Sequence, residues 1–107
     1  MNDVTFLEAA RSIGQRMLKE GGDDTPSRLR YGFRLVAGRT PLTEEEQILA
    51  ENLQYHLEYF SSHTDKVERF LAQGESVADS KLSPTELAAY ASVASLLLNS
   101  DEAVTKH

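Results

Sequence analysis

The sequence predicts an all-α protein that folds as a single compact bundle of about five helices covering residues 1–107. Three observations predict this fold class. Apolar residues recur with helical spacing along most of the chain. Capping residues, proline or glycine stand at the ends of these stretches. No stretch alternates apolar and polar residues for long enough to predict a strand, and the length suits one domain.

The first helix is expected between Phe6 and Glu20, where apolar residues gather on one side. Gly21 and Gly22 end it, because glycine accepts the left-handed conformation that a helix end requires. The opposite side is expected to be polar and carries Glu8, Arg11, Gln15 and Lys19.

The second helix is expected to follow Asp24, a capping residue that comes just before a proline suited to the first helical turn. It should end near Ala37, with Gly38 as its stop. A capping box of Thr43 and Glu46 opens the third and longest helix, which should reach residue 61 or 62. Its apolar arc is expected to hold Ile48, Leu49, Leu53, Tyr55, Leu57, Tyr59 and Phe60.

A short fourth helix is expected over Asp65–Gln73, and residues 75–82 are expected to form a loop. Ser83 and Glu86 make a second capping box, with a proline at the first helical position. The helix that follows should run to about Asn99, where polar residues predict a break before a last helical turn. It is apolar on nearly all sides, which is typical of the central helix of a bundle.

The composition excludes several classes of function. With 11 Lys and Arg against 17 Asp and Glu, the net charge is −6. This balance argues against binding to nucleic acids or anionic membranes, because both attract a positive field. The longest mostly apolar stretch, Leu87–Leu98, is too short to span a bilayer, so no membrane insertion is expected. Without cysteine there is no disulfide, thiolate nucleophile or c-type haem attachment motif.

No residue is predicted to be catalytic, to bind a cofactor or to hold a metal. His56 and His63 are seven residues apart on the long helix, whereas helical zinc ligands usually stand three or four apart. His56 also lies among apolar residues, which favours a packed histidine. Glu44, Glu45 and Glu46 suit the positive end of the helix dipole and need no catalytic explanation. The sequence has neither a nucleophile turn nor a glycine-rich phosphate loop.

Charge is the most uneven feature of the sequence. Residues 26–40 contain no acid, and the long helix after them contains no base. The structural interpretation is that the two helices are neighbours whose charges pair at the surface. The functional interpretation is that the arginines face a partner or an anionic ligand. The candidate residues for interaction or anion binding are Arg28, Arg30, Arg34 and Arg39.

A set of short motifs occurs in a definite order along the chain. They are R-L-R-Y-x-F-R-L at residues 28–35, G-R-x-P-L-T-x-E-E at 38–46, G-E-S at 74–76, P-x-E-L-A-A-Y at 84–90 and L-L-N-S-D-E-A-V-T-K at 97–106. From about Phe6 to Lys106 the chain therefore resembles the C-terminal helical region of the planctomycete surface-domain family, a domain of unknown function in large planctomycete cytochrome-like proteins. Tyr90 stands where that family often has tryptophan, and Ala103 where its last motif has an aromatic residue.

The resemblance implies that the chain is the C-terminal part of a larger exported protein, in the periplasm or at the cell surface, whose cytochrome domain lies elsewhere. It implies no catalytic residue and no cofactor in this part. We therefore expect a non-catalytic structural or interaction module that docks onto upstream domains of the same protein or onto another copy.

Two alternatives stay open. The chain is either a small-ligand or anion-binding module that uses the Arg28–Arg39 basic stretch, or a fragment of an enzyme whose active site lies upstream. Docking predicts that these arginines pair with the glutamates of the long helix. Anion binding predicts that they converge without carboxylate partners.

Overall fold

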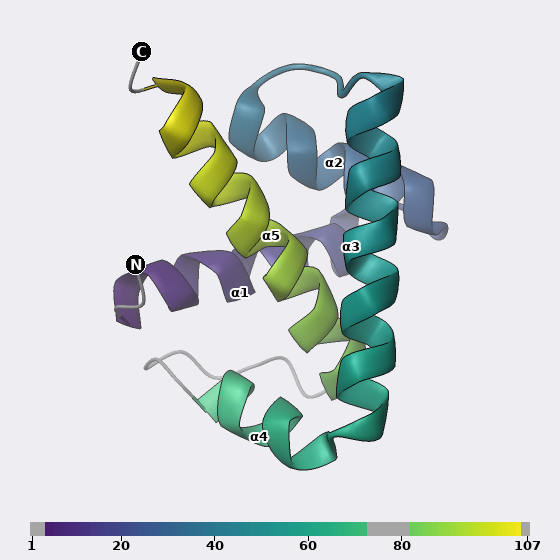
Figure 1. The fold of residues 1–107 in the computed structure, drawn as a ribbon, viewed down its shortest axis with the longest axis vertical. Coiled ribbons are helices and arrows are strands. Elements are labelled where there is room, and N and C mark those ends of the chain that lie inside the picture. Colours follow the sequence, from purple (N-terminus) through teal and green to yellow (C-terminus); the bar gives the residue numbers. More distant parts are fainter. Residues whose placement is uncertain (1–3, 73–81, 106–107) are drawn as a thin grey trace.

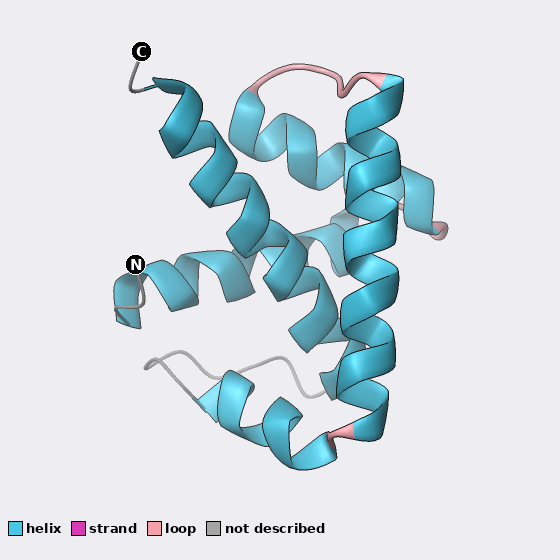
Figure 2. Cartoon of the chain, viewed as in Figure 1, coloured by secondary structure: helices cyan, strands magenta, loops and turns pink. Residues whose placement is uncertain are grey.

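The computed structural model describes the backbone of residues 4–72 and 82–105, and the side chains of residues 7–72 and 82–99. Within these ranges all regular secondary structure is helical, the helices are joined by short loops, and there is no strand (Figure 2). The helices are α1 (Val4–Glu20), α2 (Thr25–Ala37), α3 (Thr43–Ser62), α4 (Thr64–Ala72) and α5 (Pro84–Thr105). The radius of gyration is 13.0 Å, the value expected of a compact domain of this length. The predicted fold class is confirmed.

The helix α5 forms the centre of the bundle. It contacts each of the other helices, most extensively α1, and passes between α1 and α3 (Figure 1). The small side chains of α5 let the neighbouring helices approach closely. Its larger side chains pack with those of the neighbouring helices in the core. Fully buried residues of α5 include Leu87, Ala88, Ala89, Ala91, Val93 and Ala94. This segment is apolar on nearly all sides because it is the central helix of the bundle, as the sequence predicted.

The ends of α2 follow the sequence signals. The Asp24 side chain accepts a hydrogen bond from the backbone N–H of Ser27 at 3.0 Å, as a helix cap does. Gly38 has a φ of 76°, in the left-handed region, and its N–H donates to the Arg34 carbonyl. Both boundaries of this helix are thus fixed by residues recognisable in the sequence.

The predicted start of α3 was wrong by one residue. The N-cap is Leu42 rather than Thr43, and the backbone N–H of Leu42 donates to Oε1 of Glu45 at 2.8 Å. Leucine has no side-chain acceptor, so only the carboxylate half of a capping box forms. This shift leaves Glu46 free of the capping role that the sequence suggested and available to another partner.

The predicted break after Asn99 was also wrong, because α5 continues to Thr105. Residues 99–105 contain neither glycine nor proline, and their polar residues disfavour a helix only slightly. At the other end, Ser83 caps the helix as predicted, with its Oγ accepting from the Glu86 N–H at 3.3 Å. No helix in the described ranges is long and apolar enough to cross a membrane. The loop predicted over 75–82 lies almost entirely outside the described residues.

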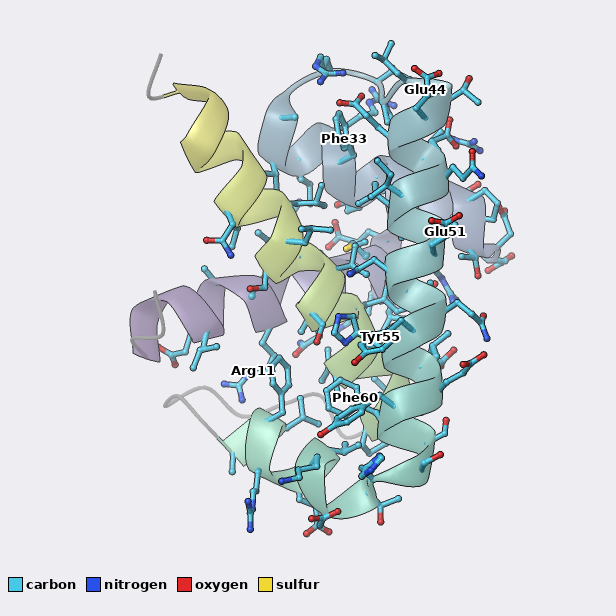
Figure 3. All side chains as sticks on the ribbon, in the orientation of Figure 1. Arg11, Phe33, Glu44, Glu51, Tyr55 and Phe60 are labelled. Carbon is cyan, nitrogen blue, oxygen red and sulfur yellow. The ribbon has the colours of Figure 1, made fainter. Side chains whose placement is uncertain are left out.

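A further correction concerns Arg11, which the helical spacing placed on the polar side of α1. Its side chain is only 3% exposed, and its Nη1 donates to the carbonyl oxygen of Leu71 in the last turn of α4. Figure 3 shows Arg11 reaching from α1 toward α4. An arginine that bonds an end carbonyl of a neighbouring helix satisfies a group that the helix itself leaves open. The polar side of α1 is therefore partly covered by α4.

Candidate interaction surfaces

Two of the four candidate arginines pair with glutamates of α3. Arg30 contacts Oε1 of Glu46 at 3.0 Å, and the guanidinium of Arg39 donates to both carboxylate oxygens of Glu45, at 2.9 and 2.8 Å. The Arg39 guanidinium, together with the Leu42 N–H, lowers the pKa of Glu45 to about 2. This is the structural pairing expected of adjacent helices. It fastens α2 to the beginning of α3.

Arg28 is engaged in another way. Its Nε donates to the carbonyl oxygen of Gly22 at 3.0 Å, and its guanidinium lies 5.9 Å from the centre of the Tyr90 ring. The first contact holds the turn between α1 and α2, and the second is a cation–π contact with α5. Arg28 is therefore a structural link and faces no carboxylate.

Arg34 is the exception among the four. Its side chain is exposed. Among the described residues, no group forms a hydrogen bond, an ion pair or an aromatic contact with its guanidinium. It borders a surface hollow of about 410 Å³ that is also lined by Tyr31, Leu35 and Gly38. The four arginines therefore do not converge on one site. Of the four, only Arg34 has a guanidinium without any partner among the described residues.

The two histidines of the long helix have different surroundings. His56 is partly buried against Phe60, with ring centres 6.1 Å apart, and this burial lowers its pKa. His63 caps the end of α3, with its Nδ1 2.8 Å from the Tyr59 carbonyl oxygen. In the described part of the chain, no three His, Asp or Glu residues are grouped so that they could hold a metal ion.

The structure separates residues that the sequence had placed in one apolar arc of α3. Leu49, Leu53 and Phe60 are buried, but Ile48 is 57% and Tyr55 is 63% exposed. Ile48 and Tyr55 are seven residues apart and so lie on the same side of the helix, away from the core. A signal for this was present in the sequence, because the arc was too wide for one helix to bury against one core.

Aromatic rings extend this exposed side toward the end of the helix. The Tyr55 and Tyr59 rings are nearly parallel with centres 6.5 Å apart, and the Tyr59 and His63 rings stack with centres 4.4 Å apart. We call Ile48, Tyr55, Tyr59 and His63 the outer stripe of α3. Ile48 and Tyr55 are the strongly exposed apolar members of the stripe, whereas Tyr59 is partly buried and also packs against the core.

A row of acidic residues accompanies the outer stripe. Glu44, Glu51 and Glu58 are exposed and spaced by seven residues, so they form a line on the neighbouring side of α3. Glu58 accepts a hydrogen bond from Gln54, and no described base pairs with any of the three. Figure 3 shows Glu44, Glu51 and Tyr55 in succession along the helix. The surface thus combines an apolar strip with an uncompensated negative edge.

No family model matches the chain, and neither a curated protein nor a solved structure matches it significantly. Within residues 7–72 and 82–99, two surfaces are candidates for binding: the outer stripe of α3 with its acidic row, and the hollow beside Arg34.

Proposed function

We propose that this chain is a non-catalytic interaction module of a larger exported protein, at the cell surface or in the periplasm, and that it docks through the outer stripe of α3. The observation that carries the proposal is the exposure of Ile48 and Tyr55 on one side of a helix whose other side buries Leu49, Leu53 and Phe60. Large apolar side chains that line up on a surface mark interaction sites more often than scattered ones do.

The charge beside the stripe determines what kind of partner fits. Glu44, Glu51 and Glu58 attract a surface that has basic residues at its edge and apolar residues at its centre. A second copy is a poor partner for this surface, because α3 has no Lys or Arg and two such helices would bring their acidic rows together. The proposed occupant is therefore a basic, amphipathic segment in the upstream domains of the same parent protein.

The motif order supports this location. In the proposed arrangement the chain is the end of a long multidomain protein, where an upstream partner is always at high effective concentration. A tethered partner of this kind does not require a large interface, because linkage adds avidity without new contacts. A strip the size of one helix face is sufficient under these conditions.

The test is a binding titration between this chain and the separately expressed region that precedes it in the parent protein. Tyr55→Ala removes an exposed ring of the stripe, and we expect the Kd to rise at least about 30-fold, as for a central aromatic residue of an interface. The matched control is Gln47→Ala, which truncates an exposed side chain of α3 outside the stripe and should leave the Kd within about two-fold.

Charge reversal tests the second half of the proposal. Glu51→Lys should weaken binding, and its effect should shrink as salt rises from low to physiological concentration. If Tyr55→Ala and Gln47→Ala changed the Kd equally, the outer stripe would not be part of the interface. A solution mass of two copies by light scattering, abolished by Tyr55→Ala, would show instead that the chain pairs with itself.

A further inference from the structure

The surface of α2 carries two adjoining hollows that share the side chains of Tyr31 and Arg34. The larger, of about 410 Å³, is lined by Tyr31, Arg34, Leu35 and Gly38. The smaller, of about 270 Å³, is lined by Gly21, Ser27, Arg30, Tyr31, Arg34 and Thr40. The volume of the larger hollow lies within the range of volumes found for small-molecule binding sites.

The larger hollow combines one free cation with an apolar wall. Its lining positions 31, 34, 35 and 38 follow the i, i+3, i+4, i+7 pattern and so lie on one side of α2 and its C-cap. Leu35 is 39% exposed there, and a Cβ built on Gly38 would meet nothing within 4 Å, so the end of the hollow is open. The Arg34 guanidinium is therefore placed next to apolar surface and has no protein partner in the described residues.

The neighbouring charged groups are already engaged. The Tyr31 hydroxyl bonds Glu20 and also accepts from Nη2 of Arg16 at 3.1 Å, which holds the tyrosine ring as a fixed wall. Arg30, which reaches the smaller hollow, is paired with Glu46. A ligand in the larger hollow would therefore meet a single uncompensated positive charge.

We infer that the larger hollow binds a small amphiphilic monocarboxylate, with its carboxylate on Arg34 and its apolar part against Leu35 and the Tyr31 ring. The planar guanidinium offers two parallel N–H donors that match a carboxylate. One free cation suits one negative charge, whereas a polyphosphate requires several. The site lies on α2 and does not involve the outer stripe of α3, so it stands or fails independently of the proposed docking.

The test uses hexanoate as the probe, followed by NMR at the amides of Leu35 and Gly38 and the ring of Tyr31. For a ligand of this size in an open hollow we expect saturable shifts with a Kd on the order of 10 mM. Arg34→Gln should raise the Kd at least about ten-fold. The matched control is Arg69→Gln, which removes an exposed positive charge from α4 and should leave the Kd unchanged.

The neutral analogue 1-hexanol separates the carboxylate from the apolar part. We expect hexanol to bind at least about ten-fold more weakly than hexanoate. Equal binding of the two probes would overturn the assignment of Arg34 as the carboxylate ligand. If Arg34→Gln and Arg69→Gln weakened hexanoate binding equally, the effect would be one of net charge and not of Arg34 as a ligand. If the shifts never saturated, there would be no binding site in the hollow.

Discussion

The crossing of α1 and α5 is closed by one glycine, and its replacement by alanine is the sharpest test of the packing described above. A Cβ built on Gly14 would lie 2.7 Å from the backbone nitrogen of Ala91 and 3.0 Å from the carbonyl carbon of Tyr90. Both are backbone atoms of the central helix, so no side chain can rotate away. The two helices must move apart to admit a methyl group.

The size of the effect follows from two opposing terms. Ordinary contacts begin near 3.4 Å, so α1 and α5 must separate by about 0.7 Å over their most extensive contact. Overpacking of a tight core costs about 3 kcal/mol at the upper end of its usual range. Alanine regains about 1 kcal/mol over glycine in the middle of a helix. We expect Gly14→Ala to lower the free energy of unfolding by about 2 kcal/mol, and Tm by roughly 10 °C.

The assay is urea and thermal unfolding followed by far-UV circular dichroism. Gly32→Ala is a matched comparison, because the three nearest atoms to its new Cβ all belong to the Met17 side chain, Sδ and Cε at 2.6 Å and Cγ at 2.9 Å, rather than to the backbone. It should therefore cost clearly less than Gly14→Ala. If Gly14→Ala were as stable as the wild type, or less damaging than Gly32→Ala, the close approach of α1 and α5 would be refuted.

Three further changes test other parts of the fold. Arg11→Met leaves the Leu71 carbonyl without its donor and should lower the free energy of unfolding by about 1–3 kcal/mol in urea titrations, an effect that a solvent-facing Arg11 would not produce. Gly38→Ala places a side chain at a φ of 76° and should cost about 1 kcal/mol in the same assay, although the site is open. The Glu45 pKa of about 2 lies below the ordinary glutamate value of 4.5, so this carboxylate stabilises the fold above pH 4.5 and loses that contribution as pH falls toward 2. Arg39→Gln should raise the Glu45 pKa toward its ordinary value in an NMR titration, and an unchanged value would assign the shift to the Leu42 N–H alone.

Most of the local structure could be predicted from single residues. Asp24, Gly38 and Ser83 end or begin helices through bonds that each residue makes within one turn of itself, and such local chemistry does not depend on the rest of the fold. The failures were also local. Thr43 and Glu46 have the spacing of a capping box, but Glu45 is the residue whose carboxylate accepts from the N-cap N–H. The polar residues after Asn99 disfavour a helix too weakly to end α5.

The candidate surfaces were less predictable, because exposure depends on which elements meet. Arg11 and Tyr55 show this in opposite directions. Helical spacing placed Arg11 on a polar side that α4 then covered, and placed Tyr55 in an apolar arc that no helix covered. The same holds for the arginines, since nothing in residues 26–40 distinguishes Arg34 from the three that found partners in α3, the α1–α2 turn and α5.

The sequence alone therefore determined that five helices form in the described part of the chain and that Asp24, Gly38 and Ser83 cap them, because each of these features depends on neighbours within a few residues. The all-round apolarity of the segment after Pro84 also predicted that it would be the central helix. Only the tertiary structure decided which apolar and charged groups remain at the surface. Burial is shared between segments distant in the chain, as between Arg11 and Leu71, and no single segment records what will pack against it. The outer stripe of α3 and the free charge of Arg34 are what that packing left uncovered.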